Sequence, residues 1–507
     1  MPSVSSPVRT VVRASSYNIY VDLEVDREHV LIIHGYTGAY DLVSANASRW
    51  LRALDRRPPK PLYGSWSDQA SQESCHSPSS QTIDLLTRRG YLTQLTIEEE
   101  RDRFDHIVEV THKRSLSRAP LYVVMPTYDC NLRCAYCFQD HMRTDSRYSR
   151  LLRCVDVSTV DRIVGSFSHI ERHHGIVPDT AITRNVLFFG GEPLLRTSHT
   201  AVSRMMDKVR SMGPAVFTAV SNATELEAFA DRLGPDGISR IQITLDGPRQ
   251  RHDERRIYSD GSGSFEKIVA NIDLALSLGV YIDVRMNIDK TNLNDIGELA
   301  NFFVDRRWVE NPQFSAYAAA VHGSLNKTGK GVLLNSHELS EKMGSLAAQV
   351  PAIAHIATPN DALRWKFQSI LGRGAALQPP MKASYCGAHS GMYVDAFCDI
   401  YACWERTGDP NLRVGHIEEN GSVNFVGAKL AEWHSRNVTS NETCAQCRYS
   451  MYCGGGCAVL AEGLHGTVYG NYCDAFARRF RQTLAETYSA DSFTDALDEH
   501  VVSMRNL

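Results

Sequence analysis

The stretch "MPTYDCNLRCAYCFQDHM", residues 125–142, brings three cysteines together at Cys130, Cys134 and Cys137. The spacing Cys-x3-Cys-x2-Cys supplies three thiolates, one fewer than a closed tetrahedral metal site requires. Thiolate ligands suit iron–sulfur clusters and zinc alike. Spacing alone therefore leaves two interpretations open. One is a structural zinc knuckle with a distant fourth ligand, and the other is a cubane cluster with one iron open to another molecule.

The composition is that of a globular protein with more than one core. The chain has 507 residues, of which 43% are hydrophobic and 22% are charged, so two to four domains are expected. A net charge of -4 argues against a general nucleic-acid binder. No apolar run is long enough to span a membrane, and the first residues lack the apolar core of a signal peptide. We therefore expect no nucleic-acid partner, no membrane partner and a cytoplasmic location.

The thirteen cysteines are unevenly placed along the chain. Three lie at 130–137 and eight between 386 and 473, with only Cys75 and Cys154 elsewhere. Clustered thiols in a reducing compartment indicate metal binding rather than disulfides.

The hydrophobic periodicity predicts an α/β chain in four parts. Residues 1–117 combine strand and helix patterns with a flexible stretch at 56–81, which is typical of a winged-helix-like α+β domain. From 118 to 350, six strand patterns alternate with helix patterns, which predicts a parallel sheet with right-handed crossovers, a partial (β/α)6 barrel. Residues 351–475 are irregular and rich in Cys and Gly, and residues 476–507 read as closing helices.

Unusual polar and glycine residues follow the predicted strands. The carboxyl ends of parallel strands are where barrels hold their sites, so these residues are candidates for a shared site with the cysteine loop. They are Gly190, Gly191, Glu192 and Pro193, then Ser221 and Asn222, then Asp246 and Gly247.

Tyr136 stands directly before the last cysteine of the opening motif, just after the first strand of the predicted barrel. This Cys-x3-Cys-x-aromatic-Cys arrangement resembles the radical S-adenosylmethionine (SAM) superfamily. The resemblance implies a [4Fe-4S] cluster held by Cys130, Cys134 and Cys137, with SAM as the missing fourth ligand. One electron, from a donor such as flavodoxin or ferredoxin, would then cleave SAM to a 5′-deoxyadenosyl radical that abstracts hydrogen.

Further motifs resemble the same superfamily. "FFGGEP" is similar to its glycine-rich loop, which binds the SAM amino group, and "VSNATEL" is similar to its Thr-Asn-Gly turn. "ITLDGPRQRHDERR" and "VRMNID" resemble the peptide- and protein-modifying branch, where His252, Asp253, Arg256 and Asn287 also match. For His252 and Asp253, a hydrogen bond that orders the loop competes with a chemical role. The resemblance implies SAM contacts at Gly190, Gly191, Glu192, Pro193, Ser221, Asn222, Thr244, Asp246 and Arg285.

The C-terminal cysteines resemble the seven-cysteine pattern of the SPASM domain, which holds auxiliary [4Fe-4S] clusters. The resemblance implies one cluster on Cys444, Cys447, Cys453 and Cys473, and another on Cys386, Cys403 and Cys457. A zinc ribbon is the alternative. Cys398 stands where the family usually has glycine, so it either ligates the second cluster or is a buried thiol in a glycine position.

Three functions compete. The first is a maturase that crosslinks, oxidises or epimerises a residue of a ribosomally made precursor peptide. The N-terminal domain would capture that peptide at a sheet edge. The second is a sulfatase-maturase-like enzyme that forms formylglycine, and the third is a non-enzymatic zinc scaffold. By position only, Glu405 and Tyr401 are candidates for the catalytic acid or base.

Overall fold

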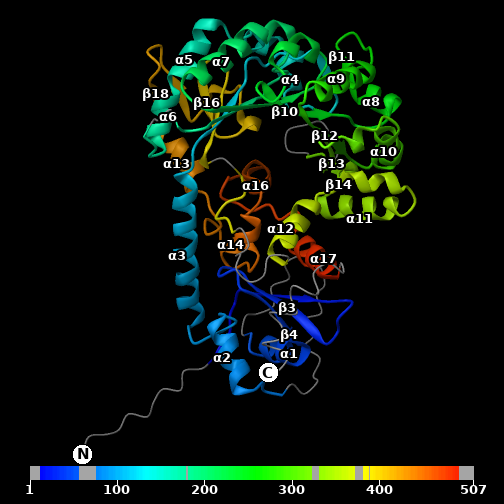
Figure 1. Ribbon diagram of the computed structural model, residues 1–507. Coiled ribbons are helices and arrows are strands. Elements are labelled where there is room, and N and C mark those ends of the chain that lie inside the picture. The colour runs from blue at the N-terminus through cyan, green and yellow to red at the C-terminus, as the bar shows by residue number, and fades with distance from the viewer. Residues whose placement is uncertain are drawn as a thin grey trace, which may run out of the picture. The chain divides into compact units, whose positions relative to one another are not determined.

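The computed structural model describes residues 12–55, 76–177, 181–322, 330–371, 381–386 and 389–489 (Figure 1). Cys75 lies outside these ranges. The chain forms two compact units, each built from more than one segment. The first comprises Met1–His112, Asn360–Tyr385 and Asn437–Leu507, and the second comprises Lys113–Pro359 and Cys386–Arg436. No helix in the described ranges has the length and apolarity needed to cross a bilayer.

The second unit is an open sheet with helices between its strands. Its strands are β6 (Leu121–Val124), β7 (Leu132–Cys134), β8 (Arg184–Phe188), β9 (Ala215–Ser221), β10 (Ile238–Thr244), β11 (Arg256–Tyr258), β12 (Tyr281–Ile288), β13 (Phe314–Ala320), β14 (Ile356–Ala357), β15 (Gly391–Val394), β16 (Asp399–Tyr401), β17 (Gly415–Ile417) and β18 (Val423–Phe425). Its helices are α4 (Asp140–Thr144), α5 (Val157–Gly165), α6 (Phe167–His173), α7 (His199–Ser211), α8 (Arg249–Arg255), α9 (Phe265–Ser277), α10 (Ile296–Asp305), α11 (Ser336–Ala347) and α13 (Gly427–Ser435).

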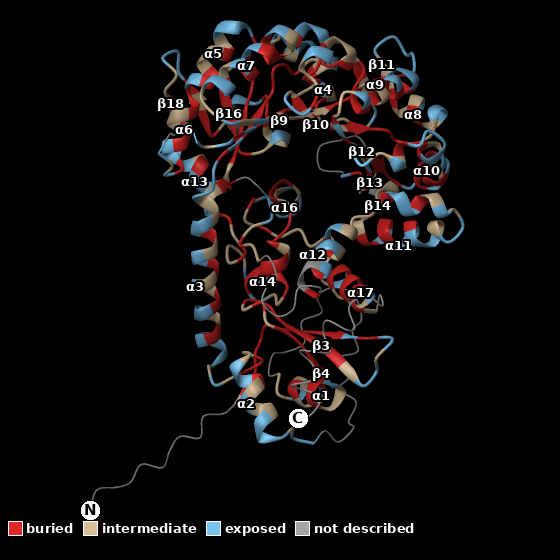
Figure 2. Ribbon diagram, in the orientation of Figure 1, coloured by how far each residue is buried: buried red, intermediate tan, exposed pale blue. Residues whose placement is uncertain are grey.

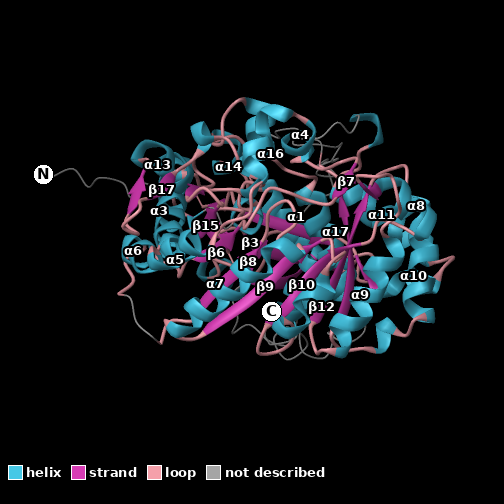
Figure 3. Ribbon diagram, turned by 90° about the horizontal axis from the view of Figure 1, so that it is seen from above, coloured by secondary structure: helices cyan, strands magenta, loops and turns pink. Residues whose placement is uncertain are grey.

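The strand order of this sheet is β14-β13-β12-β10-β9-β8-β6-β15-β16-β17-β18. From β14 to β15 neighbouring strands are parallel, and β15 to β18 continue as an antiparallel meander. Consecutive parallel strands lie side by side, as the fan of strands in Figure 3 shows. The two ends of the sheet do not pair, so the predicted partial barrel with its six strands β6, β8, β9, β10, β12 and β13 is confirmed.

The helices cover this sheet with their apolar faces. In Figure 2 the strands are buried, while helices such as α5 and α7 are buried on one side and exposed on the other. The amphipathic period of these segments accounts for that division. Side-chain caps fix where the helices begin: Asp156 accepts a hydrogen bond from the Thr159 N–H at the start of α5, 2.8 Å. Asn335 and Glu338 form a capping box at α11.

The first unit is built on a small antiparallel sheet. Its strands are β1 (Arg13–Ala14), β2 (Asn18–Asp22), β3 (His29–His34), β4 (Tyr40–Ser44) and β5 (Leu92–Thr93). Its helices are α1 (Ala45–Ala53), α2 (Ser80–Arg88), α12 (Asp361–Leu371), α14 (Glu442–Ala445), α15 (Ser450–Cys453), α16 (Ala458–His465) and α17 (Phe476–Ser489). The strand orders are β2-β3-β4 and β1-β5. A small α+β sheet domain at the N-terminus is therefore confirmed.

Both faces of the β2-β3-β4 sheet are covered within the first unit. Residues along a strand point alternately to its two faces. Ile19 and Leu31 pack on one face with Phe480 of α17, whereas Tyr20 and Ile32 pack on the other with residues of α1 and α2. The C-terminal helix α17 therefore shares a core with the N-terminal strands, although the two are distant in sequence.

One long helix, α3 (Ile97–Leu116), was not anticipated from the sequence. Its N-terminus is held by a reciprocal pair: the Glu99 N–H donates to Thr96 Oγ1, 3.1 Å, and the Thr96 N–H donates to the Glu99 carboxylate, 2.8 Å. This capping box stabilises a helix whose charged surface hides its apolar stripe. The boundary between the two units falls in its last turns, between His112 and Lys113.

Candidate active site

The three cysteines of the opening motif lie on the loop that leaves β6 and leads to α4. Part of this loop, β7, pairs antiparallel with β11, which places Cys134 opposite Arg256. All three thiols are free. The pKa of Cys130 is raised to about 12 and that of Cys134 to about 11, mainly by burial and in smaller part by a neighbouring cysteine of the motif. The motif therefore gathers its thiols in a buried place where metal binding has to release protons.

N–H groups of the chain point at these sulfur atoms. Arg143 donates to Cys137 Sγ at 3.0 Å, Asn222 Nδ2 to Cys130 Sγ at 3.5 Å, and the Leu132 N–H to Cys130 Sγ at 3.4 Å. Hydrogen bonds to the sulfur atoms are a standard means by which proteins tune an iron–sulfur cluster. The free thiols and their N–H donors fit such a cluster.

A single zinc ion and a cubane cluster make different demands on the arrangement of their ligands. Within the described ranges, no three His, Cys, Asp or Glu side chains converge as the ligands of one ion. A cubane cluster takes its thiolates at separate iron corners, so its ligands need not meet at a point. The geometry of the loop is consistent with the cubane interpretation of the motif.

Gly190 and Gly191 allow the loop after β8 to lie against the cysteine loop. The Gly191 N–H donates to the Thr127 carbonyl at 3.1 Å. A Cβ on Gly191 would come closer than 3.0 Å to the Asp129 carbonyl oxygen, and one on Gly190 would come as close to that of Thr127. Gly190 also has a φ of 139°, which favours glycine. The close backbone approach expected of these glycines is made here to the cysteine loop itself.

Glu192 is buried and joins the loops after β8 and β9. One carboxylate oxygen accepts from Ser221 Oγ, 2.8 Å, and the Leu194 N–H, 2.9 Å, and the other accepts from the Asn222 N–H, 2.5 Å. Burial raises its pKa to about 7, against the effect of these hydrogen bonds. The sequence interpretation placed Glu192 as an open charge for an ammonium group. In the structure, its carboxylate is committed to the chain's own donors, because the adjoining loop folds over it.

Asn222 is held in a tight turn beside the first cysteine. Its amide nitrogen donates to Asn131 Oδ1, 2.9 Å, and its amide oxygen accepts from the Thr224 N–H, 2.9 Å, and hydroxyl, 2.7 Å. Ala223 has a φ of 62°, the left-handed conformation for which the related Thr-Asn-Gly turn uses glycine. The turn brings the amide of Asn222 to Cys130.

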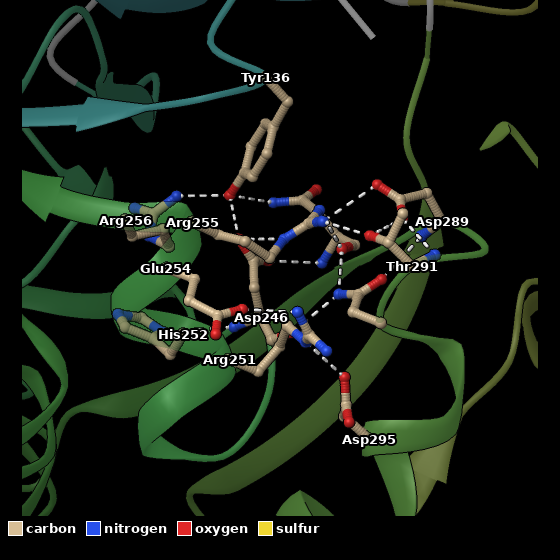
Figure 4. A network of polar contacts seen from close by, with 12 residues as sticks. Tyr136, Asp246, Arg251, His252, Glu254, Arg255, Arg256, Asp289, Thr291 and Asp295 are labelled. Atoms are coloured by element: carbon tan, nitrogen blue, oxygen red, sulfur yellow. Dashed lines mark hydrogen bonds and ion pairs between the residues drawn. The ribbon is translucent and has the colours of Figure 1, made fainter. Parts of the chain in front are cut away.

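A polar network links the cysteine loop to the ends of β10 and β12 (Figure 4). The Tyr136 hydroxyl donates to Asp246 Oδ2 and accepts from Arg256, 2.7 Å, and from Asn287 Nδ2, 3.1 Å. The guanidinium of Arg255 lies over the Tyr136 ring, 5.2 Å from its centroid. Asp246 is fully buried, and its other oxygen accepts from the Asn287 N–H, 2.9 Å. Tyr136 therefore tethers the cysteine loop to two strand ends.

The ends of β10, β12 and β13 present further candidate residues side by side. Thr244 pairs with Arg285 across β10 and β12, and Arg285 pairs with Tyr317 across β12 and β13. Arg285 Nε donates to Asn287 Oδ1 at 2.9 Å. The predicted contacts at Thr244, Asp246 and Arg285 thus gather at one edge of the sheet, as the strand ends of a barrel require.

His252 and Asp253 order the loop after β10. His252 is fully buried, and its Nδ1 accepts from the Asp246 N–H, 3.4 Å, while Nε2 contacts Ser264 Oγ, 3.0 Å. Burial lowers the pKa of His252 well below its usual value. Asp253 accepts from the Ser264 and Phe265 N–H groups at the start of α9, 2.8 and 2.9 Å. Of the two alternatives for this pair, the structure favours the loop-ordering role.

The C-terminal cysteines are divided between the two units. Cys386 and Cys403 belong to the second unit, where both act on the pKa of Tyr393, which burial raises. Cys457 belongs to the first unit. The predicted cluster on Cys386, Cys403 and Cys457 has ligands in both units and stays a prediction.

Cys398 occupies a turn between β15 and β16. Its φ is 65°, in the left-handed region, and its side chain is fully buried. Arg162 Nε donates to its sulfur atom at 3.0 Å. The charged groups that act on its pKa, which burial raises, are Arg162, Asp395 and Asp399, none of them a cysteine. This setting favours the buried thiol in a glycine position over a cluster ligand.

Four cysteines gather in the first unit. The pKa of Cys444 is raised to about 12, mainly by burial and in smaller part by Cys447, Cys453 and Cys473. Asn471 Nδ2 donates to Cys473 Sγ at 3.2 Å. Gly454, Gly455 and Gly456, which follow Cys453, have positive φ values, and a Cβ on Gly456 would collide with the Tyr472 carbonyl oxygen. Four close cysteines with an N–H donor fit a fully ligated cluster.

The two acid–base candidates are placed differently. Tyr401 is 1% exposed and packs with Val123, Tyr128 and Tyr393, and burial raises its pKa. Tyr401 therefore packs in the core of the second unit, and its role as an acid or base stays a prediction. Glu405 is half-buried on a short 3-10 turn, Trp404–Arg406.

The sequence reading missed the partners of Tyr136 and the sulfur contact of Arg143. Polar residues at the end of the apolar strand β12, such as Asn287, were the available signal for the first. Arg143 carried no motif, since its role depends on the one-turn helix α4 that directs it back to Cys137.

Residues 124–303 match the sequence profile of the radical SAM superfamily. The GTP 3′,8-cyclase of Listeria welshimeri is 24% identical over 305 residues, which cover 59% of this chain and 84% of the relative. Among solved structures, anSMEcpe with bound AdoMet aligns with 75% of this chain and 99% of its own, at 16% identity and a TM-score of 0.53. The same protein with AdoMet and the Cp18Cys peptide gives a TM-score of 0.50 at 16% identity, over 76% of this chain and 99% of its own.

The family match and the fold likeness agree with the observed geometry at the cysteine loop and the partial barrel. The profile begins at Val124, the last residue of β6, and covers the cysteine loop and the strands from β7 to β12. The likeness to anSMEcpe shows the same fold over three quarters of the chain. With three free cysteines after the first strand of a partial barrel, residues 124–303 form a domain of the radical SAM superfamily, and the chain is a radical SAM enzyme.

Proposed function

We propose that this radical SAM enzyme modifies a residue of a ribosomally made peptide, by crosslinking, oxidation or epimerisation. The observation that carries the proposal is a second group of close cysteines, Cys444, Cys447, Cys453 and Cys473, in a chain that already has a three-cysteine loop. Auxiliary clusters give an electron a place to go after hydrogen abstraction, which oxidation of a peptide requires. The fold shared with anSMEcpe, solved with AdoMet and a peptide, supports the same substrate class.

In this proposal, Cys130, Cys134 and Cys137 hold a [4Fe-4S] cluster, and Gly190, Gly191, Pro193, Asn222, Thr244 and Arg285 surround SAM. When bound, the cluster and SAM supply one-electron cleavage of the sulfonium and a radical that abstracts hydrogen. The guanidinium of Arg285 would hold the SAM carboxylate by charge-assisted hydrogen bonds. Glu192, Ser221 and Asp246 would act indirectly, since their hydrogen bonds fix the loops that carry these contacts.

The remaining parts of the chain would serve the peptide and the electrons. Residues 1–117 would capture the precursor peptide beside an edge strand of the β2-β3-β4 sheet, where main-chain hydrogen bonds give affinity. The barrel would comprise 118–350, the auxiliary-cluster domain 351–475 and the tail 476–507. A reduced flavodoxin or ferredoxin would deliver the electron, in a cytoplasmic setting.

The test is co-expression of the enzyme with candidate precursor peptides in an anaerobic host, followed by tandem mass spectrometry. We expect one peptide to lose hydrogen atoms at a fixed residue, or to change its stereochemistry there, and the Cys130→Ala enzyme to leave it unmodified. Formylglycine at a Cys or Ser would replace the crosslinking proposal with the sulfatase-maturase alternative. Consumption of GTP by the purified enzyme, with no peptide modified, would overturn the proposal.

A further inference from the structure

A chain of hydrogen bonds with a fixed direction runs from Asp246 to Arg285. Tyr136 is bonded to Asp246, Arg256 and Asn287 through its single hydroxyl (Figure 4). Asn287 continues the chain, because its amide oxygen accepts from Arg285 Nε at 2.9 Å. The members come from three places: the cysteine loop, the loop after β10 and the strand β12.

The chemistry of these groups leaves one arrangement of hydrogens. A guanidinium has donors only, so the Tyr136 oxygen accepts from Arg256. The single hydroxyl hydrogen goes to the Asp246 carboxylate, so the bond between Tyr136 and Asn287 is one that the Asn287 NH2 group donates. The amide oxygen of Asn287 then faces Arg285, whose Nε–H can only donate. The hydrogen bonds to Tyr136 and to Arg285 therefore require the same orientation of the Asn287 side-chain amide.

We infer that Tyr136 and Asn287 are positioning residues that set the guanidinium of Arg285 for the SAM carboxylate. The tyrosine between the second and third cysteines would thereby couple the cluster loop to the SAM site. The inference rests on the proposed role of Arg285. It adds two residues that would act on SAM through the side chain of Arg285.

Burial makes this coupling effective. Asp246 is fully buried, Arg256 is 7% exposed and Asn287 is 9% exposed. Removing the hydroxyl would leave three buried polar groups each short of one partner, and the Asn287 amide would be held through Arg285 alone. The amide would gain freedom to turn, and the preferred direction of the Arg285 guanidinium would be lost.

The experiment compares Tyr136→Phe with the wild-type enzyme after anaerobic cluster reconstitution. Tyr281→Phe is the matched control, because Tyr281 lies at the start of the same strand β12 and is 48% exposed. We expect Tyr136→Phe to keep its iron content and to raise the dissociation constant for SAM about tenfold, as loss of a buried hydrogen-bond partner predicts. The shift that SAM causes in the electron paramagnetic resonance of the reduced cluster would also be weakened. Tyr281→Phe should match the wild type in all three measurements.

A double mutant distinguishes transmission through this chain of hydrogen bonds from a general destabilisation of the cysteine loop. Asn287→Ala removes the middle of the chain, so adding Tyr136→Phe to it should cause no further loss of SAM affinity. If the two substitutions reduced SAM affinity additively, the inference that Tyr136 acts through Asn287 would be overturned. If Tyr136→Phe fails to take up iron, Asn287→Ala decides alone, because Asn287 is outside the cysteine loop. An unchanged SAM dissociation constant for Asn287→Ala would overturn the inference.

Failure of the inference and failure of the proposed function give different results. If the wild type binds SAM and Arg285→Lys weakens binding while Tyr136→Phe does not, only the inference falls. If the wild type with full iron content binds no SAM, the proposed function falls, and the inference with it.

Discussion

At the residue scale, the site depends on side chains whose protonation and partners are set by burial. Burial raises the pKa of Cys130 and Cys134 well above the range of a free thiol. Their thiolates therefore form when a metal displaces the protons, which couples assembly of the site to cluster insertion. The N–H donors from Arg143 and Asn222 are already in place to receive the thiolates.

Replacing one motif cysteine should remove the cluster without unfolding the chain. For Cys130→Ala we expect a loss of about four irons per chain, one cubane, and no 5′-deoxyadenosine from SAM. Cys154→Ala is the control, since Cys154 is a half-buried free cysteine outside every motif. Iron analysis and chromatography of the nucleoside check both variants. Equal SAM cleavage by the two variants would contradict the assignment of the cysteine loop.

His34 predicts how the stability of the first unit depends on pH. Burial lowers its pKa from 6.5 to about 4, and its Nε2 contacts Ser15 Oγ at 2.9 Å. Between pH 4 and 6.5 the unfolded state binds the proton more readily, so the free energy of unfolding falls as the pH falls. From pH 7 to pH 4.5 the loss should be about 2.5 kcal/mol for this group alone.

Chemical denaturation of the wild type and of His34→Asn at both pH values measures this effect. The wild type should lose more stability on acidification than the variant, since other titrating groups affect both equally. Parallel losses in the two proteins would show that His34 does not titrate as its burial requires.

At the element scale, the loops after β6, β8 and β9 form one interlocked structure. Backbone contacts of Gly191 and the carboxylate of Glu192 connect them. Each loop therefore depends on its neighbours for its conformation, and none of them is a separate binding segment.

Gly191→Ala adds a single methyl group, but it should disturb the packing of the loops after β6, β8 and β9 strongly. The new Cβ would press on the carbonyl oxygens of Tyr128 and Asp129, which are backbone atoms and cannot turn aside. We expect a destabilisation of about 1–3 kcal/mol, as overpacking typically causes, and a fall in iron uptake. Thermal unfolding and iron analysis test this. Gly165→Ala is the control, because a Cβ there meets nothing within 4 Å, and equal behaviour of the two variants would contradict the packing argument.

Periodicity predicted the elements of the barrel well, and tertiary partners explain the rest. The strands predicted at 215–221 and 281–288 coincide with β9 and β12. Over most of each strand, buried apolar residues alternate with less buried ones, which is the period-2 pattern of a strand. Helix α3 was missed although Thr96 and Glu99 carry the capping-box signature, since its charged residues mask the apolar stripe. Motifs indicated Asn222 and Arg285. Asp246 and Asn287 were marked as polar residues beside strand ends, but their pairing with Tyr136 was not predictable, because each is more than a hundred residues away in sequence.

At the scale of the whole molecule, two units carry different sets of thiols. The second unit holds the radical SAM cysteines, and the first holds the four-cysteine group on the segment after residue 436. The linear order does not reveal that this segment shares a unit with the N-terminal strands, since their common core forms only on folding.

Damage to the four-cysteine group should separate SAM cleavage from peptide modification. For Cys447→Ala we expect SAM cleavage to persist, because the cluster loop is untouched, and modified peptide to disappear. The measurement is the ratio of modified peptide to 5′-deoxyadenosine in the same reaction. An unchanged ratio would show that the auxiliary thiols take no part in the chemistry.

The most direct test is the iron, sulfide and SAM-cleavage analysis of anaerobically prepared wild-type protein. Three cubane clusters require about twelve irons and as many sulfides per chain, and reduction in the presence of SAM should yield 5′-deoxyadenosine. Bound zinc in place of iron, with SAM left intact, would contradict the account at its centre.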